Sequence, residues 1–420
     1  MKFIYKKLYS LFRCWIYTIV SVSTPAIAQE NNWDLSSDTG VELRIFPKSP
    51  KYEPQLNTWQ PSLMLTGAAK WQSIDGVHQT LIETFVRIDW QDNERTHIDL
   101  REAYYRYSSD SEWSVLIGAT KVFWGVAESL HLVNIINQTD MLEDIDGEDK
   151  LGQPMIQFSL EKDWGTLDFF VLPFFRERYY PGENGRLRLP FTIDKHASLF
   201  DGSKDKSTLD FSLRYSHYMG AWDISFSIFN GLSREPRLAT MPSEGHLFSL
   251  YDKITQYGFD VQYTTDAWLW KFETIYRNTD LDNFSAFVGG FEYTFYQILG
   301  ESWDLGIIIE YQYDNRKEGS FQSQSADTIE NITPNTIANN DLFYGVRLAL
   351  NDIQDTALLF GITTDVNDGS SLITLEANRR INNHWTIDIE GRFFEFLAPE
   401  NSLYLFKNDD FLNINITRRF

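Results

Sequence analysis

Apolar and polar side chains alternate with a period of two from residue 39 to the end of the chain. The clearest stretch is "SWDLGIIIEYQYD" at 302–314, where one set of alternate positions is apolar and includes Trp303, Leu305 and Ile307. The intervening positions include Asp304, Glu310 and Gln312. A period of two indicates β-strands, because successive side chains of a strand point to opposite faces. No segment shows a convincing helical period.

The alternation predicts an all-β chain of about 18 strands (16–18), each long enough to cross a bilayer when tilted. In sequence order, we expect strands near 39–47, 57–72, 78–90, 95–108, 112–122, 153–162, 164–175, 207–219, 221–232, 253–264, 267–278, 283–298, 302–314, 340–351, 354–365, 369–380, 384–397 and 409–420.

Short and long connections alternate between these strands. Short turns are followed by Trp, as in "SEWSVLIG" (111–118) and "GAWDISFSI" (220–228), whereas the long connections cover 123–152, 176–206, 233–252 and 315–339. This asymmetry predicts a transmembrane antiparallel β-barrel with short periplasmic turns and long extracellular loops. The Trp residues that follow the turns would form an interfacial girdle: 113, 164, 222, 268, 303 and 385. The alternative is a large secreted β-sandwich or propeller, neither of which requires this pattern of connections.

The first 28 residues have the features of a secretory signal. Lys2, Lys6, Lys7 and Arg13 precede or interrupt an apolar stretch, and "TPAIAQE" follows. We expect cleavage after Ala28, a short segment at 29–38 and the barrel over 39–420. Cleavage would remove these four basic residues and no acidic one, so the formal net charge of −22 would become about −26. So acidic a chain is a poor partner for nucleic acid.

The chain ends on "FLNINITRRF" (411–420), with Leu412, Ile414, Ile416 and Phe420 on one side of the expected strand. This segment resembles the closing strand of Gram-negative outer-membrane barrels, whose final aromatic residue is read by the assembly machinery. The resemblance makes Phe420 the expected assembly signal. Arg418 departs from the pattern, but an Arg near the interface can snorkel to water.

A second resemblance lies in the first long connection. "GATKVFWGVAESLHLVNIINQTD" (118–140) is similar to a segment of poorly characterised porin-like families that carry a W-G-x-E-S motif. Here two extra residues separate Trp124–Gly125 from Glu128–Ser129. The resemblance supports a porin-like barrel. We expect the 123–152 loop to fold inward as a constriction, with these motif residues: Trp124, Glu128, Asn134, Asn137 and Asp140.

Two long loops carry opposite charge. The acidic run "MLEDIDGEDKLGQP" (141–154) could hold Ca²⁺, but it lacks the order of an EF-hand loop, and we expect a solvated acidic loop over the pore mouth. The basic loop at 176–206 could pair with lipopolysaccharide phosphates or with that acidic run, or be an ordinary mixed-charge surface loop.

The polar face of the strands should line the lumen. Its charged residues include Glu83, Arg87, Arg214, Asp223, Lys271, Arg277, Glu310, Arg347, Glu390 and Arg392. Acids outnumber bases once the remaining positions are added, namely Asp210, Asp260, Glu273, Glu292, Asp304, Glu376, Arg380 and Asp388, so a mild preference for cations or neutral solutes is expected. In "DLREAYYRY" (99–107) the alternation breaks, which a β-bulge would repair.

These observations predict a porin-like channel of the cell outer membrane for passive diffusion of small hydrophilic solutes. The alternatives are a barrel that exports or takes up a specific polysaccharide or other polymer, and a structural or adhesive barrel. The seven His residues form no recognisable catalytic constellation, so no enzyme, cofactor or metal site is expected. The expected partners are outer-membrane lipid, lipopolysaccharide, the assembly machinery and small solutes, and the oligomeric state is left open.

Overall fold

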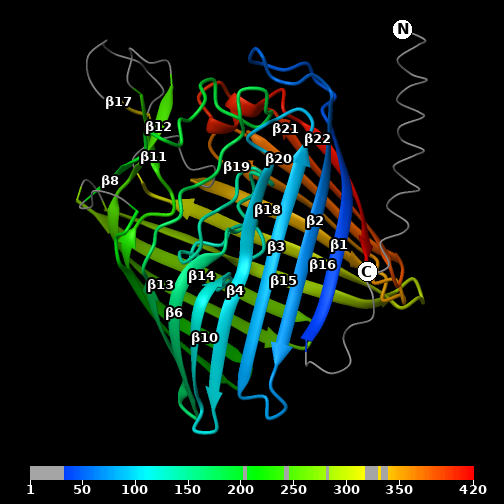
Figure 1. Ribbon diagram of the computed structural model, residues 1–420. Coiled ribbons are helices and arrows are strands. Elements are labelled where there is room, and N and C mark those ends of the chain that lie inside the picture. The colour runs from blue at the N-terminus through cyan, green and yellow to red at the C-terminus, as the bar shows by residue number, and fades with distance from the viewer. Residues whose placement is uncertain (1–32, 202–205, 241–245, 281–282, 317–329, 333–338) are drawn as a thin grey trace.

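The computed structural model describes residues 33–201, 206–240, 246–280, 283–316, 330–332 and 339–420, so the expected signal at 1–28 lies outside the described residues. Eighteen strands, each antiparallel to its neighbours, form one sheet that closes through β1 and β22 (Figure 1). The strands are β1 (Trp33–Ile45), β2 (Trp59–Gln72), β3 (His78–Asp89), β4 (His97–Ser109), β5 (Trp113–Thr120), β6 (Gln153–Lys162), β7 (Gly165–Leu172), β9 (Asp210–Met219), β10 (Trp222–Leu232), β13 (Lys253–Thr265), β14 (Trp268–Thr279), β15 (Asn283–Ile298), β16 (Trp303–Asp314), β18 (Asn340–Ala349), β19 (Ala357–Asp365), β20 (Ser371–Asn382), β21 (Trp385–Glu395) and β22 (Phe411–Arg419). The predicted fold class is confirmed.

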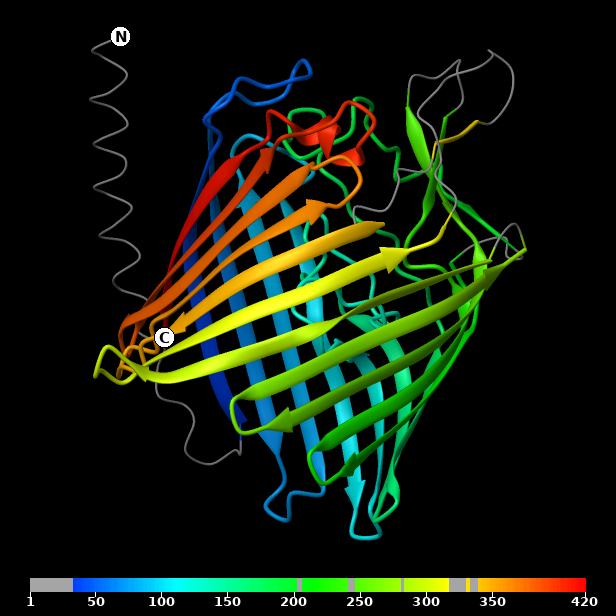
Figure 2. The same cartoon turned by 180° about the vertical axis from the view of Figure 1, so that it is seen from behind.

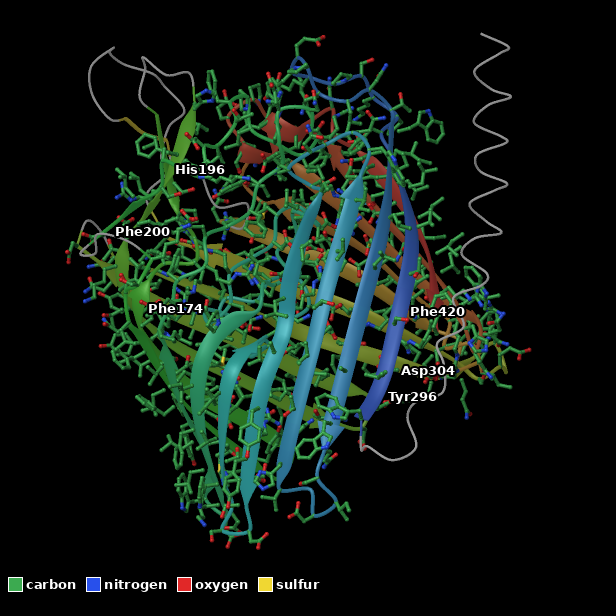
Figure 3. All side chains as sticks on the ribbon, viewed as in Figure 1. Phe174, His196, Phe200, Tyr296, Asp304 and Phe420 are labelled. Carbon is green, nitrogen blue, oxygen red and sulfur yellow. The ribbon has the colours of Figure 1, made fainter. Side chains whose placement is uncertain are left out.

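The connections divide the barrel into a turn end and a loop end. At the turn end, residues 220–221 and 266–267 suffice to join neighbouring strands, whereas at the loop end 121–152 and 173–209 are long excursions. Tyr296, Asp304 and Phe420 lie towards the turn end, and Phe174, His196 and Phe200 lie towards the loop end (Figure 3). The predicted alternation of short and long connections is therefore confirmed.

Apolar side chains cover the outer wall. Leu35 is 65% exposed and Phe226 is 52% exposed, and similar side chains recur on every second position of most strands. Each Trp of the expected girdle stands at the start of its strand or just before it. Trp222 packs against the tilted ring of Tyr263, and Trp268 packs edge-to-face with Tyr293. An apolar surface of this extent would be unfavourable in water.

A β-bulge interrupts the pairing of β3 with β4. Glu83 pairs with Glu102 and Thr84 with Leu100, so Arg101 is the extra residue. Asp99 and Arg101 therefore face inward before the bulge, and Glu102 faces inward after it. Gly152 passes close to this bulge, where an added Cβ would lie 2.3 Å from the Arg101 carbonyl oxygen. The predicted bulge is confirmed.

The last strand seals the barrel. Phe411 is buried on the inner side, whereas Ile416 and Phe420 are exposed on the outer side. The Phe420 backbone N–H donates to the Ser37 carbonyl oxygen (2.9 Å), which extends the pairing of β22 with β1. The Arg418 guanidinium lies over the rings of Phe420 (4.5 Å) and Trp385 (5.7 Å), so this exception to the terminal pattern contacts interfacial aromatic rings.

Strand β1 and the segment before β22 differ from the prediction. Strand β1 begins at Trp33 instead of 39, so it includes part of the expected N-terminal segment. A 3-10 helix, η1 (Ser402–Phe406), interrupts the all-β pattern, with the Asn401 side chain accepting from the Leu403 N–H. No helix in the described part of the chain has the length and apolarity needed to span a bilayer.

A second sheet of four short strands rises from the loop end (Figure 2). It contains β8 (Leu199–Phe200), β11 (Arg237–Thr240), β12 (Leu247–Tyr251) and β17 (Glu330–Ile332). The sequence analysis missed it, because strands of two to five residues show too little alternation to be recognised.

Candidate functional site

The connection from β5 to β6, residues 121–152, folds into the barrel (Figures 1 and 2). Two inward carboxylates of the opposite wall hold its backbone. Glu273 of β14 accepts from the N–H groups of Val126 (2.6 Å) and Ala127 (2.9 Å). Glu310 of β16 accepts from the Glu128 N–H at 2.8 Å. These contacts place this connection, the inner loop, inside the barrel, and its role as a constriction stays a prediction.

Two Asn residues fix the shape of the inner loop. The Asn134 side-chain oxygen accepts from the Trp124 N–H (2.7 Å), and the Asn137 side-chain oxygen accepts from the Val122 N–H (2.8 Å). The Asn137 amide also donates to the carbonyl oxygens of Thr120 and Leu151, both at 2.9 Å. Asn134 and Asn137 therefore shape the loop, and both also line the cavity at the loop end that is described below.

Glu128 of the inner loop reaches two bases on the far wall. Its carboxylate lies 2.5 Å from Arg347 on β18 and 3.5 Å from Lys271 on β14. The Arg347 side chain is 40% exposed, unlike most inward charges of the barrel. Glu128 and Arg347 thus form a charged contact that is partly open to water.

A second set of ion pairs anchors the acidic end of the inner loop. Arg87 of β3 binds both Glu143 and Glu42, the latter at 3.0 Å. Arg392 of β21 lies 3.1 Å from Asp144. Arg392 also lies 2.8 Å from Asp146 and 3.0 Å from Glu376. Glu143 and Asp144 are buried and pair with wall arginines, so the expectation of a solvated acidic loop was wrong for these two residues, whereas Asp146 and Glu148 are exposed.

Burial and ion pairing shift the pKa values of Glu143 and Asp144 in opposite directions. Burial disfavours the charged form of Glu143, but the Arg87 guanidinium outweighs it and lowers the pKa of Glu143 to about 2. Burial and the neighbouring Asp146 raise the pKa of Asp144 to about 7, in spite of Arg392.

An apolar cluster fills part of the lumen between the inner loop and β5–β15. Trp124 packs edge-on against Phe170 (5.7 Å between ring centroids), and Arg214 stacks over Trp124 while it pairs with Asp260 at 2.9 Å. The other buried members are Leu116, Val133, Ile135, Ile136, Met155, Leu172, Phe229, Ile254, Ile275 and Ala286. On this side the inner face of the strands is therefore largely apolar and buried against the inner loop, and the inward charges Arg214 and Asp260 pair with each other. The sequence contained evidence for this apolar cluster, because several of its residues are apolar at positions on the polar face of their strands.

The basic loop lies over the loop end and is held by internal contacts. Arg186 is fully buried, lies 2.6 Å from Asp409, and donates to the Asn57 carbonyl oxygen at 2.8 Å. Arg176 lies 2.6 Å from Asp99 of β4, and Lys195 lies 2.6 Å from Glu94. These side chains are therefore engaged within the chain; Lys204 lies outside the described residues.

A cavity of about 610 Å³ lies at the loop end, between the inner loop, the basic loop and η1. Seven bases and four acids line it: Lys150, Arg178, Arg188, Arg234, Arg237, Arg277, Arg316, Asp146, Glu148, Glu235 and Asp252. The guanidinium groups of Arg277 and Arg316, at 2.7 and 3.1 Å, lower the pKa of Glu235 well below the ordinary value. Basic side chains outnumber acidic ones in the lining of this cavity, whereas the sequence predicted an excess of acidic side chains for the lumen as a whole.

The remaining residues predicted to line the lumen differ in their solvent exposure. Arg277 is buried, and its guanidinium lies 2.7 Å from the Glu235 carboxylate. Glu83, Asp223 and Glu390 are half-buried on the inner face, and the Glu390 carboxylate accepts from the Asn413 amide at 3.1 Å. Asp140 lies against the β4 wall, where its carboxylate is 3.5 Å from His97.

No protein-family model and no curated protein matches this chain. Among solved structures, it is similar to engineered variants of the porin of Rhodopseudomonas blastica. One variant has a TM-score of 0.44 and 9% identity, covering 92% of this chain and 100% of that chain. A triple mutant of the same porin has a TM-score of 0.43 and 8% identity, with the same coverage. Similarity this remote carries no argument about function, and the barrel is established by the strand pairings of the chain itself.

Proposed function

We propose that this protein is an outer-membrane channel for passive diffusion of small hydrophilic solutes, constricted by the inner loop. The apolar outer wall and the ring of Trp residues support insertion in a bilayer. An 18-stranded barrel encloses enough space for water unless it is filled. Here the inner loop and its apolar cluster occupy the side of β5–β15, so we infer that the passage lies along β18–β20.

The partly exposed contact between Glu128 and Arg347 carries this proposal. Across the lumen from the apolar cluster, the half-exposed side chains of Arg347 on β18 and Glu376 on β20 lie on one wall, both level with Leu359 of β19, and Glu128 of the inner loop faces Arg347. Opposite charges across a narrow passage produce a transverse field that admits polar solutes and disfavours apolar ones. Selection between ions would then depend on these few charges.

Single-channel recording in planar bilayers tests the proposal. The wild-type barrel should show steady conductance, Arg347→Ala should shift the reversal potential towards cation selectivity, and Glu128→Gln should shift it towards anion selectivity. The Glu310 contact to the Glu128 backbone does not involve the Glu128 side chain, so the loop should stay in place in Glu128→Gln. Arg379→Ala is the matched control, because Arg379 is an exposed arginine that pairs with Asp352 in the 350–356 link.

A second candidate function is transport of a specific substrate, such as a polysaccharide. The filled lumen and the base-rich cavity at the loop end favour it, because an anionic polymer would be attracted there. A barrel that conducts only after a polyanion is added would support this alternative. Absence of conductance under every condition would leave only a structural or adhesive role.

The membrane partners follow from the same proposal. We infer that outer-membrane lipid contacts the apolar wall, that lipopolysaccharide surrounds the loop end, and that the assembly machinery engages Phe420. The internal pairing of the basic loop makes its arginines poor candidates for lipopolysaccharide contact.

A further inference from the structure

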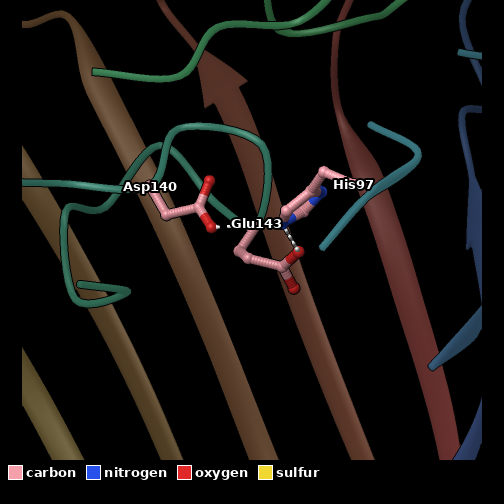
Figure 4. Close-up of side chains that lie close together, drawn as sticks. All are labelled: His97, Asp140 and Glu143. Carbon is pink, nitrogen blue, oxygen red and sulfur yellow. Dashed lines mark ion pairs between the residues drawn. The ribbon is translucent and has the colours of Figure 1, made fainter. Parts of the chain in front are cut away.

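Three side chains from distant parts of the chain converge where the inner loop meets β4. His97 is the first residue of β4, and Asp140 and Glu143 belong to the inner loop (Figure 4). The His97 Nε2 atom lies 3.5 Å from Asp140 Oδ2 and 3.9 Å from Glu143 Oε1, and all three atoms lie within 4.8 Å of one another.

The other ring nitrogen of His97 determines what Nε2 can do. His97 Nδ1 lies 2.9 Å from the Arg95 carbonyl oxygen. A carbonyl oxygen can only accept, so Nδ1 carries the hydrogen and the neutral imidazole presents a bare lone pair at Nε2. That lone pair points at two carboxylates, so three acceptors face one another with no donor among them.

The atoms of this cluster are buried, and two of them lack hydrogen-bond partners. The side chains of His97 and Asp140 are 10% and 2% exposed, and neither His97 Nε2 nor Asp140 Oδ2 has a hydrogen-bond partner among the described residues. Unsatisfied buried acceptors are costly, and three aimed at one point require a positive group between them.

The surroundings hold all three ligand atoms in place. Phe85 and Tyr179 pack against the His97 ring at centroid distances of 5.6 and 6.0 Å. Asp140 Oδ1 accepts from the Leu142 N–H at 3.2 Å. Arg87 Nε donates to Glu143 Oε1 at 2.8 Å, which leaves that oxygen a second lone pair. Outer contacts of this kind orient metal ligands in proteins.

We propose that His97, Asp140 and Glu143 bind one divalent transition-metal ion of the Zn²⁺ class. One imidazole nitrogen and two carboxylate oxygens suit Zn²⁺, whereas Ca²⁺ and Mg²⁺ prefer sites built from oxygen alone. Tetrahedral Zn²⁺ with bonds of about 2.0–2.1 Å places its ligand atoms roughly 3.3 Å apart, so Asp140 Oδ2 already lies close to the required distance from His97 Nε2, and Glu143 Oε1 would have to move inward from 3.9 Å.

The ion would fasten the middle of the inner loop to the β4 wall. The loop has carboxylate anchors on β14 and β16 and an ion pair from Glu143 to Arg87 of β3, and the metal would add a direct link to the neighbouring strand β4. This proposal does not rest on conduction, because binding is measured without a membrane.

Calorimetric titration of EDTA-treated, detergent-purified full-length barrel with ZnCl₂ at pH 7.5 tests the site. We expect one Zn²⁺ per chain, and a loss of affinity of about tenfold or more in His97→Ala and in Asp140→Asn. Co²⁺ should give the intense visible d–d bands of a tetrahedral centre. His217→Gln, a variant on β9 outside the cluster, should bind as the wild type does.

Heat-modifiable migration in electrophoresis confirms that each variant is folded. If neither His97→Ala nor Asp140→Asn folds, the stoichiometry and the Co²⁺ spectrum of the wild type decide the matter. Absence of stoichiometric Zn²⁺ in the wild type would overturn the proposal and leave a proton on Nε2 as the bridging positive group. Equal binding by folded variants and wild type would overturn it as well.

Discussion

The Glu310 carboxylate on β16 accepts two hydrogen bonds from Ser129 of the inner loop, one from its backbone N–H (2.8 Å) and one from its hydroxyl (2.6 Å). Glu310 is fully buried. These residues are far apart in sequence, so their contact fixes how deeply the loop enters the barrel.

Replacing Glu310 with Gln should loosen the inner loop. The substitution keeps an acceptor of similar size but removes the charge, and hydrogen bonds to charged groups contribute about 1.5–3 kcal/mol. We expect a lower melting temperature, with a loss of about 2 kcal/mol, and frequent gating in single-channel recordings. Glu301→Gln in the exposed turn 299–302 is the control. Quiet recordings and an unchanged melting temperature in Glu310→Gln would show that Glu310 does not hold the loop.

Replacing Arg186 with Met should release the cover at the loop end. Both Arg186 and Asp409 are fully buried, and removal of the base leaves an unpaired buried carboxylate. Such a loss costs about 3–5 kcal/mol. Urea unfolding of the detergent-solubilised barrel measures it, and adding Asp409→Asn should recover part of the loss. Lys195→Met, which breaks an exposed pair with Glu94, should change stability by less than about 1 kcal/mol. Equal effects of the two single variants would contradict this account.

The contribution of His131 to stability should depend on pH. Burial alone would lower the pKa of His131, but hydrogen bonds and opposite charge from Glu148 and Glu273 outweigh it and raise the pKa to about 9. Since the folded pKa is raised, the stabilisation is fully present below the unfolded value of about 6.5 and is lost as pH rises through about 9. With allowance for the half-exposed Glu148, it amounts to roughly 2 kcal/mol.

Thermal unfolding of His131→Gln against wild type over a pH series, in EDTA, measures this effect. The difference in melting temperature should be largest near pH 6, where His131 is charged in both states, and small near pH 10. His384→Gln in the turn 383–384 is the control. A difference that grows with pH would reverse the assigned charge of His131.

Replacing Phe420 with Ala should impair assembly more than stability. The backbone hydrogen bond from residue 420 to Ser37 survives the substitution, so the purified, refolded barrel should melt close to the wild type. The amount of folded barrel in the outer membrane should fall several-fold, measured by heat-modifiable migration. Phe396→Ala is the matched control, because Phe396 is 82% exposed outside the strands. An unchanged level of Phe420→Ala in cells would refute the assembly role.

The sequence alone determined the wall of this protein. Every one of the 18 expected strands is present, because each strand alternates between an apolar outside and an inside, and this alternation is a local property. The lengths of the connections likewise predicted the turn end and the loop end of the barrel, because connection length is also a local property of the sequence. Even the bulge at Arg101 could be predicted, since an extra residue shifts the alternation.

Only the tertiary structure decided what fills the barrel. Positions such as Phe170 and Ile275 face inward, and their burial depends on a loop that is distant in sequence. The partners of Arg87 and Arg186, and the meeting of His97 with Asp140, likewise require long segments to fold back across the lumen. The alternation of a strand states which face a residue occupies, but what occupies the space beyond that face is determined by contacts between distant segments.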